Sequence, residues 1–218
     1  MASHELKTPL TSLMAYTDLL QRLLERENNL QTGHYLSRMN AQLTKLTKLI
    51  ADLLDISKAQ AGKLIFTEEA VAIDDLLREE IEHFQPTALQ HHILIEGETA
   101  CEVVGDRDRL GQVILNLLSN AIKYSPEADK VVVRLVREAT EVRVSIQDFG
   151  IGIPADQLEH IFERFYRVSV NREKQFPGLG IGLYISYEII RHHGGRIWVD
   201  SVEGWGSTFF FALPLKQA

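Results

Sequence analysis

Apolar residues recur with helical spacing along the first quarter of the chain. From residue 3 to about residue 26 the spacings alternate between four and three, at Leu6, Leu10, Leu13, Thr17, Leu20 and Leu24. After the polar break ENNLQTG, a second run alternates spacings of three and four, at Leu36, Met39, Leu43, Leu46, Ile50 and Leu53. The first run has the period of a helix and the second that of a heptad seam. We therefore expect two amphipathic helices joined by a short polar loop.

Two such helices form an antiparallel hairpin, and a lone hairpin leaves much of each apolar stripe in water. Four further leucines widen the stripes: Leu19, Leu23, Leu49 and Leu54. A second copy of the hairpin would bury them in a dimeric four-helix bundle across a two-fold axis. The alternative is a hairpin that packs on the rest of its own chain.

The heptad pattern stops at about Gly62, and strands and helices then alternate. KLIFTEEAVAI, HHILIEGE and CEVVGD read as extended, and DKVVVRLVREATEVRVSIQDFG reads as two strands about a turn near Thr140. Helical patterns lie in DDLLREEIEHFQPTALQ, RDRLGQVILNLLSNAIKY and IGLYISYEIIRHHGG, and the strands RIWVDSV and GSTFFFALPL close the chain. This order predicts an α/β sandwich with a mixed, largely antiparallel sheet. We expect two domains, an α domain at 1–62 and an α+β domain at 63–218.

Composition narrows the functional classes. A 45% hydrophobic content supports a proper core, and a net charge of -7 argues against a nucleic-acid binder. Cys101 is the single cysteine, so no intramolecular disulfide can form. The longest apolar runs are far shorter than the ~20 residues of a membrane span, and no signal segment opens the chain. We expect a cytoplasmic piece, with membrane attachment only through segments absent from this chain.

The tripeptide DFG at 148–150 raises the question of a eukaryotic-type protein kinase, where it holds the magnesium of ATP. That class also needs a glycine loop, a V-A-I-K lysine and an H-R-D loop before the tripeptide. Here Asp74 stands after VAI in place of the lysine, H-R-D is absent, and GLGIGL follows the tripeptide. The order excludes this class of kinase.

Asp148 reads instead as an acid at the end of a strand. Gly150 and Gly152 follow it, so the backbone can turn sharply and a flat ligand can approach closely. A carboxylate at such a place can accept a hydrogen bond from an exocyclic amine. A structural turn alone would explain the glycines but not a buried acid.

The helix that contains NLLSNAIKY carries polar side chains on an otherwise apolar segment. Asn116 and Asn120 are four residues apart and share one face, with Lys123 and Tyr124 one turn on. Amide oxygens suit magnesium that is already bound to phosphates, Lys123 offers a charge for a phosphate, and the Tyr124 ring offers a surface for a base. The alternative is a pair of solvent-facing asparagines near a helix end.

Three glycines lie where another helix begins. PGLGIGLYI places Gly178, Gly180 and Gly182 at the helix entry, where unpaired amides and the helix dipole attract anions. A dinucleotide-binding fingerprint is the competing interpretation, but that motif follows a first parallel strand, and here a polar stretch precedes it. GWGSTFFF adds a glycine turn before the last strand.

Taken in order, SHELKTPLTSL, NLLSNAIKYS, DFGIGIP, IFERFYR, GLGIGLYIS and GWGSTFFF resemble the motif set of the bacterial two-component sensor histidine kinases. The resemblance covers nearly the whole chain. It implies a dimerisation and phosphoacceptor hairpin followed by an ATP-binding domain. The implied activity is Mg²⁺- and ATP-dependent autophosphorylation of a histidine, then transfer to an aspartate of a response regulator, with phosphatase activity toward that regulator.

The resemblance also implies roles for single residues. His4 would be the phosphoacceptor, Glu5 the base that assists it and Thr8 the residue that positions water for dephosphorylation. Asn120 and Asn116 would hold the magnesium. The residues implied at the nucleotide are Asn116, Asn120, Lys123, Tyr124, Asp148, Gly150, Gly152, Ile153, Phe165, Arg167, Gly178, Leu179, Gly180, Gly182, Leu183 and Thr208.

Elementary chemistry agrees with the implied phosphoacceptor. A neutral imidazole is a nucleophile near pH 7, and the adjacent carboxylate of Glu5 can orient or deprotonate it. Only three residues precede His4, whereas this family's phosphoacceptor usually lies well inside its first helix, so the resemblance implies a fragment. Phe149 departs from the small or polar residue common at its position.

Two rival functions remain open at this stage. One is an ATP-hydrolysing conformational machine that resembles gyrase, mismatch-repair or heat-shock chaperone ATPases. SHELKTPLTSL argues against it. The other is a non-catalytic dimerising scaffold, which would not need Asn120, Lys123, Asp148 and the glycines together.

Overall fold

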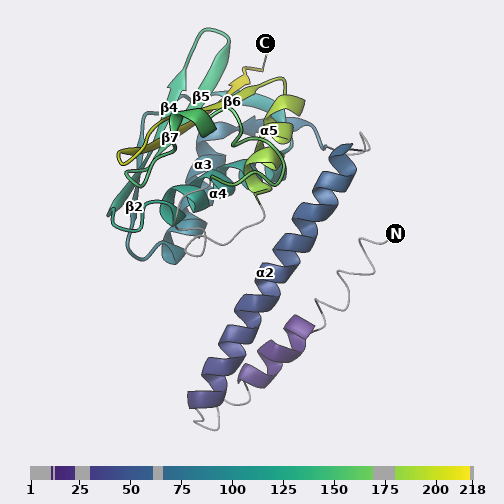
Figure 1. Cartoon of the computed structure of the whole chain (residues 1–218). Coiled ribbons are helices and arrows are strands. Elements are labelled where there is room, and N and C mark those ends of the chain that lie inside the picture. Colours follow the sequence, from purple (N-terminus) through teal and green to yellow (C-terminus); the bar gives the residue numbers. More distant parts are fainter. Residues whose placement is uncertain (1–10, 12, 23–29, 61–65, 169–179, 217–218) are drawn as a thin grey trace. The chain divides into compact units, whose positions relative to one another are not determined.

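The computed structural model of the chain describes residues 11, 13–22, 30–60, 66–168 and 180–216 (Figure 1). The chain divides into two compact units, Met1–Leu64 and Ile65–Ala218. In the described part of the chain, none of the helices combines the length and the apolar content that a bilayer crossing requires.

The described part of the first unit is helical, as its apolar spacing predicts. Residues 11 and 13–22 are helical, and α2 spans Leu30–Gln60. Thr17 is buried between the helices, where its hydroxyl bonds to the carbonyl of Leu13 at 2.9 Å and to the side chain of Asn40. Thr47 of α2 reaches the Met14 sulfur at 3.7 Å. The contacts therefore pair the two helices through polar as well as apolar side chains.

The second unit is built on a five-stranded sheet of order β2-β4-β5-β7-β6. β2 and β4 pair in parallel, and the other neighbours pair antiparallel. The strands are β2 (His92–Glu96), β4 (Lys130–Arg137), β5 (Glu141–Gln147), β6 (Arg196–Val202) and β7 (Gly206–Pro214). The mixed, largely antiparallel sheet that the sequence predicts is confirmed. The β4–β5 hairpin about Thr140 is confirmed as well, with Arg137 paired to Val142.

Two short strands form a separate sheet. β1 (Glu69–Ala72) pairs antiparallel with β3 (Glu102–Gly105), so the predicted strand CEVVGD does not join the main sheet. The predicted extended segment KLIFTEEAVAI is a strand only over Glu69–Ala72 among its described residues.

Three helices cover one face of the main sheet (Figure 1). They are α3 (Ile73–Phe84), α4 (Arg107–Lys123) and α5 (Gly182–His192), with single 3-10 turns at Gln85–Thr87 and Ala155–Gln157. Alternate strand residues point toward the helices. The core is apolar and includes Leu117, Leu118, Val133, Val144, Ile146, Ile189 and Phe211. This layer fixes α4 and α5 side by side above the sheet, and several of the predicted site residues, among them Asn116, Asn120 and Gly182, lie on these two helices.

Candidate functional site

Asp148 follows β5 and is only 3% exposed. Its Oδ1 accepts hydrogen bonds from the N–H of Gly150 at 3.0 Å and from the N–H of Ser207 at 3.2 Å. Burial raises the pKa of this carboxyl from 3.8 to about 6, although the two N–H groups act in the opposite direction. No described lysine or arginine forms an ion pair with it. A buried, unpaired carboxylate at a strand end is costly, which favours a role in binding.

The loop after Asp148 fits tightly against the end of α4. The Ile151 N–H donates to the Tyr124 carbonyl at 3.1 Å, and the Gly204 N–H donates to the Ile151 carbonyl at 2.7 Å. A side chain at Gly150 would place its Cβ 2.0 Å from that same Tyr124 oxygen, so only glycine fits. Ile153 donates its N–H to the Ser201 hydroxyl at 2.9 Å. These contacts join the Asp148 loop, which includes Gly152, to α4 and to the β6–β7 turn.

α4 presents the predicted amides and cation beside this loop. Asp106 caps the helix by accepting the Arg109 N–H at 3.0 Å, and an apolar face holds the helix on the sheet. Asn116 and Asn120 are half-buried. The Lys123 ammonium lies 3.1 Å from the Tyr124 hydroxyl and 4.7 Å from the centre of its ring.

The donor set on α4 bears on which metal could bind. Among the described residues, no group of three or more His, Cys, Asp or Glu side chains could hold a metal ion by itself. The two α4 amides offer neutral oxygens instead. Neutral oxygen ligands fit Mg²⁺ that arrives already bound to phosphates, because the phosphates supply the negative charge.

α5 begins directly beside α4. The Asn116 Nδ2 donates to the Ser186 hydroxyl at 2.9 Å. A Cβ at Gly182 would lie only 2.3 Å from the Asn116 Oδ1, so the two residues are in close contact. Leu183 follows, half-buried. The Gly180 carbonyl accepts the Phe165 N–H at 2.9 Å. The structure therefore brings Asn116, Gly180, Gly182 and Phe165 to one end of α5.

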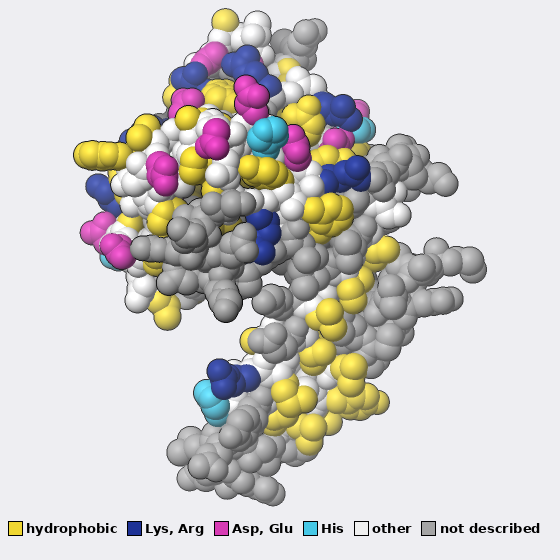
Figure 2. Space-filling view, in the orientation of Figure 1, with side chains coloured by type: hydrophobic (Ala, Val, Ile, Leu, Met, Phe, Trp, Pro, Cys, Tyr) yellow, Lys and Arg dark blue, Asp and Glu magenta, His cyan; other side chains and the backbone are white. Residues whose placement is uncertain are grey.

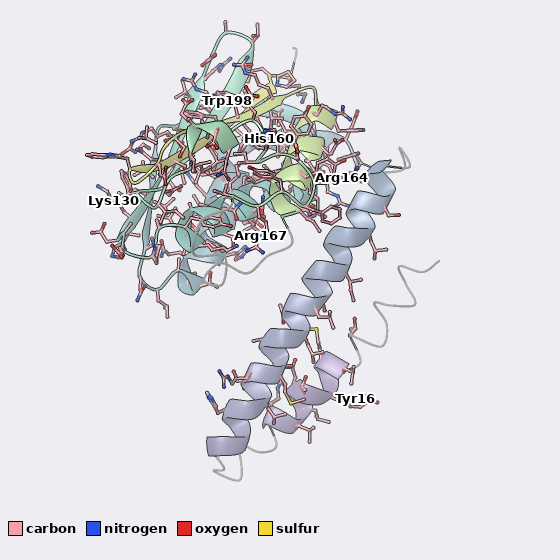
Figure 3. All side chains as sticks on the ribbon, viewed as in Figure 1. Tyr16, Lys130, His160, Arg164, Arg167 and Trp198 are labelled. Atoms are coloured by element: carbon pink, nitrogen blue, oxygen red, sulfur yellow. The ribbon has the colours of Figure 1, made fainter. Side chains whose placement is uncertain are left out.

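Arg164 and Arg167 lie just before residue 169, and Figure 3 shows them at separate positions. The Arg164 guanidinium lies over the Tyr184 ring, 5.7 Å from its centre. The Arg167 side chain lies against Gly180, with its Cγ 3.1 Å from the position of a Cβ there. Of the two, Arg167 is the one beside Gly180. Phe165 has a φ of 62°, the strained left-handed region for a residue that is not glycine.

The glycine turn before β7 places Ser207 beside Asp148. Ser207, not Thr208, donates its N–H to the Asp148 carboxylate and accepts the Asp148 N–H at 2.9 Å. Thr208 is paired with Gln147 and lies on the opposite face of the sheet, because neighbouring strand residues alternate. The alternation of buried Phe209 and Phe211 was the signal that could have identified Ser207.

Five predicted residues lie outside the described part of the chain. They are His4, Glu5, Thr8, Gly178 and Leu179. The other predicted site residues are all described. Ser186, which bonds to Asn116, was not predicted, because only the fold brings two residues 70 positions apart into contact.

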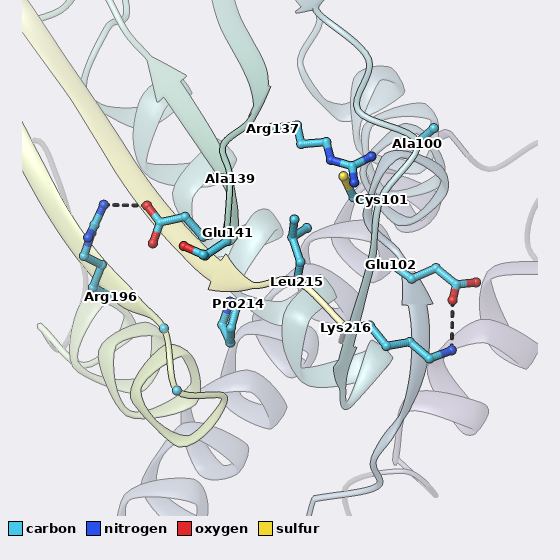
Figure 4. Close-up of a pocket in the computed structure, with 13 residues that line it drawn as sticks. Ala100, Cys101, Glu102, Arg137, Ala139, Glu141, Arg196, Pro214, Leu215 and Lys216 are labelled. Atoms are coloured by element: carbon cyan, nitrogen blue, oxygen red, sulfur yellow. Dashed lines mark hydrogen bonds and ion pairs between the residues drawn. The ribbon is translucent and has the colours of Figure 1, made fainter. Parts of the chain in front are cut away.

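A cavity of about 940 Å³ lies at the other end of the strands (Figure 4). Its lining includes the ion pairs Arg196–Glu141 and Lys216–Glu102. Glu141 opens β5 whereas Asp148 follows its end, which separates the two by on the order of 20 Å. The cavity is therefore not part of the Asp148 site.

The chain matches two protein families. Residues 1–62 match the family described as "His Kinase A (phospho-acceptor) domain". Residues 105–217 match that described as "Histidine kinase-, DNA gyrase B-, and HSP90-like ATPase". Together the matches cover most of the chain.

Proteins with a similar sequence are named as sensor proteins or sensor kinases. The sensor histidine kinase WalK of Bacillus subtilis (strain 168) is 38% identical over an alignment of 221 positions, which covers 99% of this chain and 36% of WalK. The sensor protein GacS of Pseudomonas syringae pv. syringae is 34% identical over 99% of this chain and 24% of GacS. The chain thus spans about a third or less of these two relatives.

Solved structures agree with the fold. Full-length ShkA in complex with AMPPNP aligns over all of this chain and 45% of its own, with a TM-score of 0.77 and 28% identity. The mycobacterial sensor histidine kinase MprB aligns over 70% of this chain and all of its own, with a TM-score of 0.61 and 29% identity. With both domain families matched in order and the fold shared with solved structures of sensor histidine kinases, the chain belongs to the sensor histidine kinases, whose catalytic core it comprises.

Proposed function

We propose that this chain uses ATP and Mg²⁺ to phosphorylate His4 and passes the phosphoryl group to an aspartate of a response regulator. The observation that carries the proposal is the buried carboxylate of Asp148, which forms no ion pair with a described cation. Its loop packs against the C-terminal end of α4, the helix that carries the two amides. Such a carboxylate can accept a hydrogen bond from the adenine amine. Because the reaction draws on ATP, we place it in the cytoplasm.

In this proposal, the residues around α4 and α5 bind different parts of the nucleotide. Asp148 accepts the adenine amine, with Gly150, Gly152 and Ile153 forming the wall behind it. Lys123 and Arg167 offer positive charge to phosphates, and the N–H groups at the start of α5 offer hydrogen bonds. Asn116 and Asn120 hold the metal through their amide oxygens. Bound Mg²⁺ neutralises charge on the phosphates.

The transfer step uses the phosphoacceptor segment. A nitrogen of the His4 imidazole attacks the γ-phosphorus, the bond from that phosphorus to the bridging oxygen breaks, and ADP leaves. Glu5 accepts the ring proton. In the reverse activity toward the regulator, Thr8 orients the water that hydrolyses the phosphoaspartate.

The helical unit supplies a dimer interface in this proposal. We assign residues 1–62 to dimerisation and phosphotransfer and residues 63–218 to ATP binding. Figure 2 shows hydrophobic side chains gathered along the helical unit. The exposed large hydrophobic residues among its described positions are Leu13, Tyr16, Leu19, Leu20, Met39 and Leu46. A second copy of the hairpin would bury this surface in a four-helix bundle.

Incubation with γ-labelled ATP and Mg²⁺ tests the reaction. We expect protein-bound label that survives alkali and is lost in acid, as for a phosphohistidine, and that is absent from His4→Gln. Label in His4→Gln at the wild-type level would refute the assignment of His4. Steady phosphate release without a phosphoprotein would instead support a gyrase-like ATPase.

A further inference from the structure

The amide of Asn116 is held by a side chain from a different helix. Asn116 lies on α4, and its Nδ2 donates to the Oγ of Ser186 on α5 at 2.9 Å. Ser186 is only 1% exposed. A hydrogen bond in such a shielded place is seldom broken by competing water, so it sets the rotation of the amide about its terminal bond.

The oxygen end of the same amide is also placed. A Cβ at Gly182 would lie 2.3 Å from the Asn116 Oδ1 and 3.2 Å from its Nδ2. The oxygen is therefore the atom that fills the space left by the missing side chain of Gly182. Gly182 is the first residue of α5. Hence Ser186 holds the nitrogen of the Asn116 amide, and the missing side chain of Gly182 leaves room for its oxygen at the start of α5.

We propose that Ser186 is a positioning residue, which holds the Asn116 amide so that its oxygen, and not its NH₂ group, is available to the metal of the bound nucleotide. This inference rests on the proposed function. The two ends of an amide differ chemically: the oxygen can coordinate a cation, whereas the NH₂ group only donates hydrogen bonds. Without the Ser186 hydroxyl, the NH₂ group loses its partner and the amide can turn by half a rotation. Half of its orientations would then present the wrong atom.

Packing alone does not require this hydrogen bond. α4 and α5 already meet through apolar contacts, and Ile185, Ile189 and Ile190 of α5 are buried. A serine inside a helix commonly bonds to its own backbone. Here its oxygen accepts from Asn116 of the neighbouring helix, which is a predicted metal ligand. The hydroxyl therefore acts on the orientation of Asn116 more than on the docking of the helix.

The test compares nucleotide binding with and without the metal. In Ser186→Ala of the full chain, we expect the dissociation constant for the Mg²⁺ complex of a non-hydrolysable ATP analogue to rise about fivefold to tenfold, the effect of one hydrogen bond. In EDTA, the constant for the same analogue should change less than twofold. Ile189→Val is the matched control, because it disturbs the buried face of α5 by one methylene without touching Asn116. It should not alter the ratio of the two constants.

A double-mutant cycle with Asn116→Ala separates positioning from a purely structural role. If Ser186 acts through Asn116, Ser186→Ala adds less than twofold in the Asn116→Ala background. The inference would be overturned if the two substitutions weakened nucleotide binding by independent factors that multiply in the double variant. It would also be overturned if Ser186→Ala weakened nucleotide binding equally with and without Mg²⁺. Isothermal titration calorimetry measures the dissociation constants of wild type, both single variants and the double variant. If wild type binds in an Asp148-dependent manner but Ser186→Ala behaves like wild type, only the positioning role is lost. If wild type binds no nucleotide, the proposed function fails as well.

Discussion

At the scale of single residues, two buried aspartates have pKa values that are shifted in opposite directions. Asp148 has a pKa raised to about 6, because burial outweighs the hydrogen bonds from Gly150 and Ser207. Burial also raises the pKa of Asp74, but hydrogen bonds, chiefly from Thr99, outweigh it and leave the pKa below its usual value. Ionised Asp148 therefore weakens the fold, whereas ionised Asp74 supports it.

Asp148→Asn is expected to stabilise the protein while it weakens nucleotide binding. The folded carboxyl binds its proton more tightly than the unfolded one, so wild type loses stability as the pH rises from about 4 to 6. Asparagine avoids this loss and keeps an oxygen for both N–H donors. Above pH 6 the gain in unfolding free energy should be on the order of 1 to 3 kcal/mol, and it should vanish below about pH 4. Urea unfolding at several pH values measures it.

Asp74→Asn is the matched control and should act in the opposite direction. The Asp74 carboxylate accepts the Thr99 N–H at 2.8 Å and the Thr99 hydroxyl at 2.6 Å. An amide can satisfy only one of these donors with its oxygen, so we expect a loss of about 1 to 2 kcal/mol at pH 7. This loss should shrink as the pH falls through the lowered pKa of Asp74. If Asp148→Asn also destabilises the protein at pH 7, burial of Asp148 is not a cost to the fold.

The residues of the site were predictable where the signal is local. Asp148, Asn116, Asn120 and Lys123 stand out because polar groups interrupt apolar patterns. Ser186 carries no such signal, since its importance depends on a contact with another helix. The contact of Ser207 with Asp148 was not predicted, because the motif does not state which face of the strand each residue occupies.

At the scale of elements, the start of the second unit is tied to both α4 and α5. The Thr67 N–H donates to the Asp106 carboxylate at 2.9 Å, and the Asp106 N–H donates to the His193 Nε2 at 2.9 Å. The His193 Nδ1 lies 2.7 Å from the Ile189 carbonyl, and Phe66 stacks on His192 at 3.6 Å between ring centres. This cluster joins the beginning of α4 to the end of α5.

The hydrogen bonds of His193 require the neutral ring. Nδ1 must carry the proton to donate to the Ile189 carbonyl, so Nε2 is the acceptor for Asp106. Burial lowers the pKa of His193, and His192 adds to this, whereas Asp106 and Glu68 oppose it. The folded protein therefore binds a proton here less readily than the unfolded chain does.

This histidine should make the fold weaker at mildly acidic pH. Stability is fully present above pH 6.5 and is lost as the pH falls from there toward the lowered pKa of folded His193. His193→Gln keeps an acceptor for the Asp106 N–H but cannot be protonated. We expect the variant to lose less stability than wild type between pH 7.5 and 5.5 in urea unfolding. An equal loss in both proteins would show that His193 is not the responsible group.

Elements that depend on local sequence were predicted, and those that depend on distant pairing were not. The β4–β5 hairpin follows from alternation about one turn. β3 alternates equally well, yet its partner is β1, some thirty residues earlier, and not a strand of the main sheet. Periodicity shows that a segment is extended but does not identify its neighbour.

At the scale of the whole molecule, the two units differ in what they leave exposed. The second unit buries an apolar core of its own, with Leu117, Ile146 and Phe211 each no more than 1% exposed. The helical unit leaves Leu13, Leu20, Met39 and Leu46 of its predicted seams exposed. An apolar surface of this extent is typical of an interface. Because the seam positions recur every three or four residues, a second helical hairpin is the partner that matches their spacing.

Leu46→Glu tests this assignment. The change removes a leucine from the proposed interface in both copies and introduces two charges there. Burial of each leucine contributes about 1.5 kcal/mol or more to dimerisation, and the dimer loses two of them. The dimer dissociation constant should therefore rise at least about a hundredfold. Leu89→Glu is the control, since Leu89 is 91% exposed in the second unit. Analytical ultracentrifugation should detect a monomer only for Leu46→Glu, with nucleotide affinity unchanged in both variants. A wild-type protein that is monomeric at high concentration, or a Leu46→Glu dimer of wild-type strength, would instead favour a hairpin that packs on its own chain.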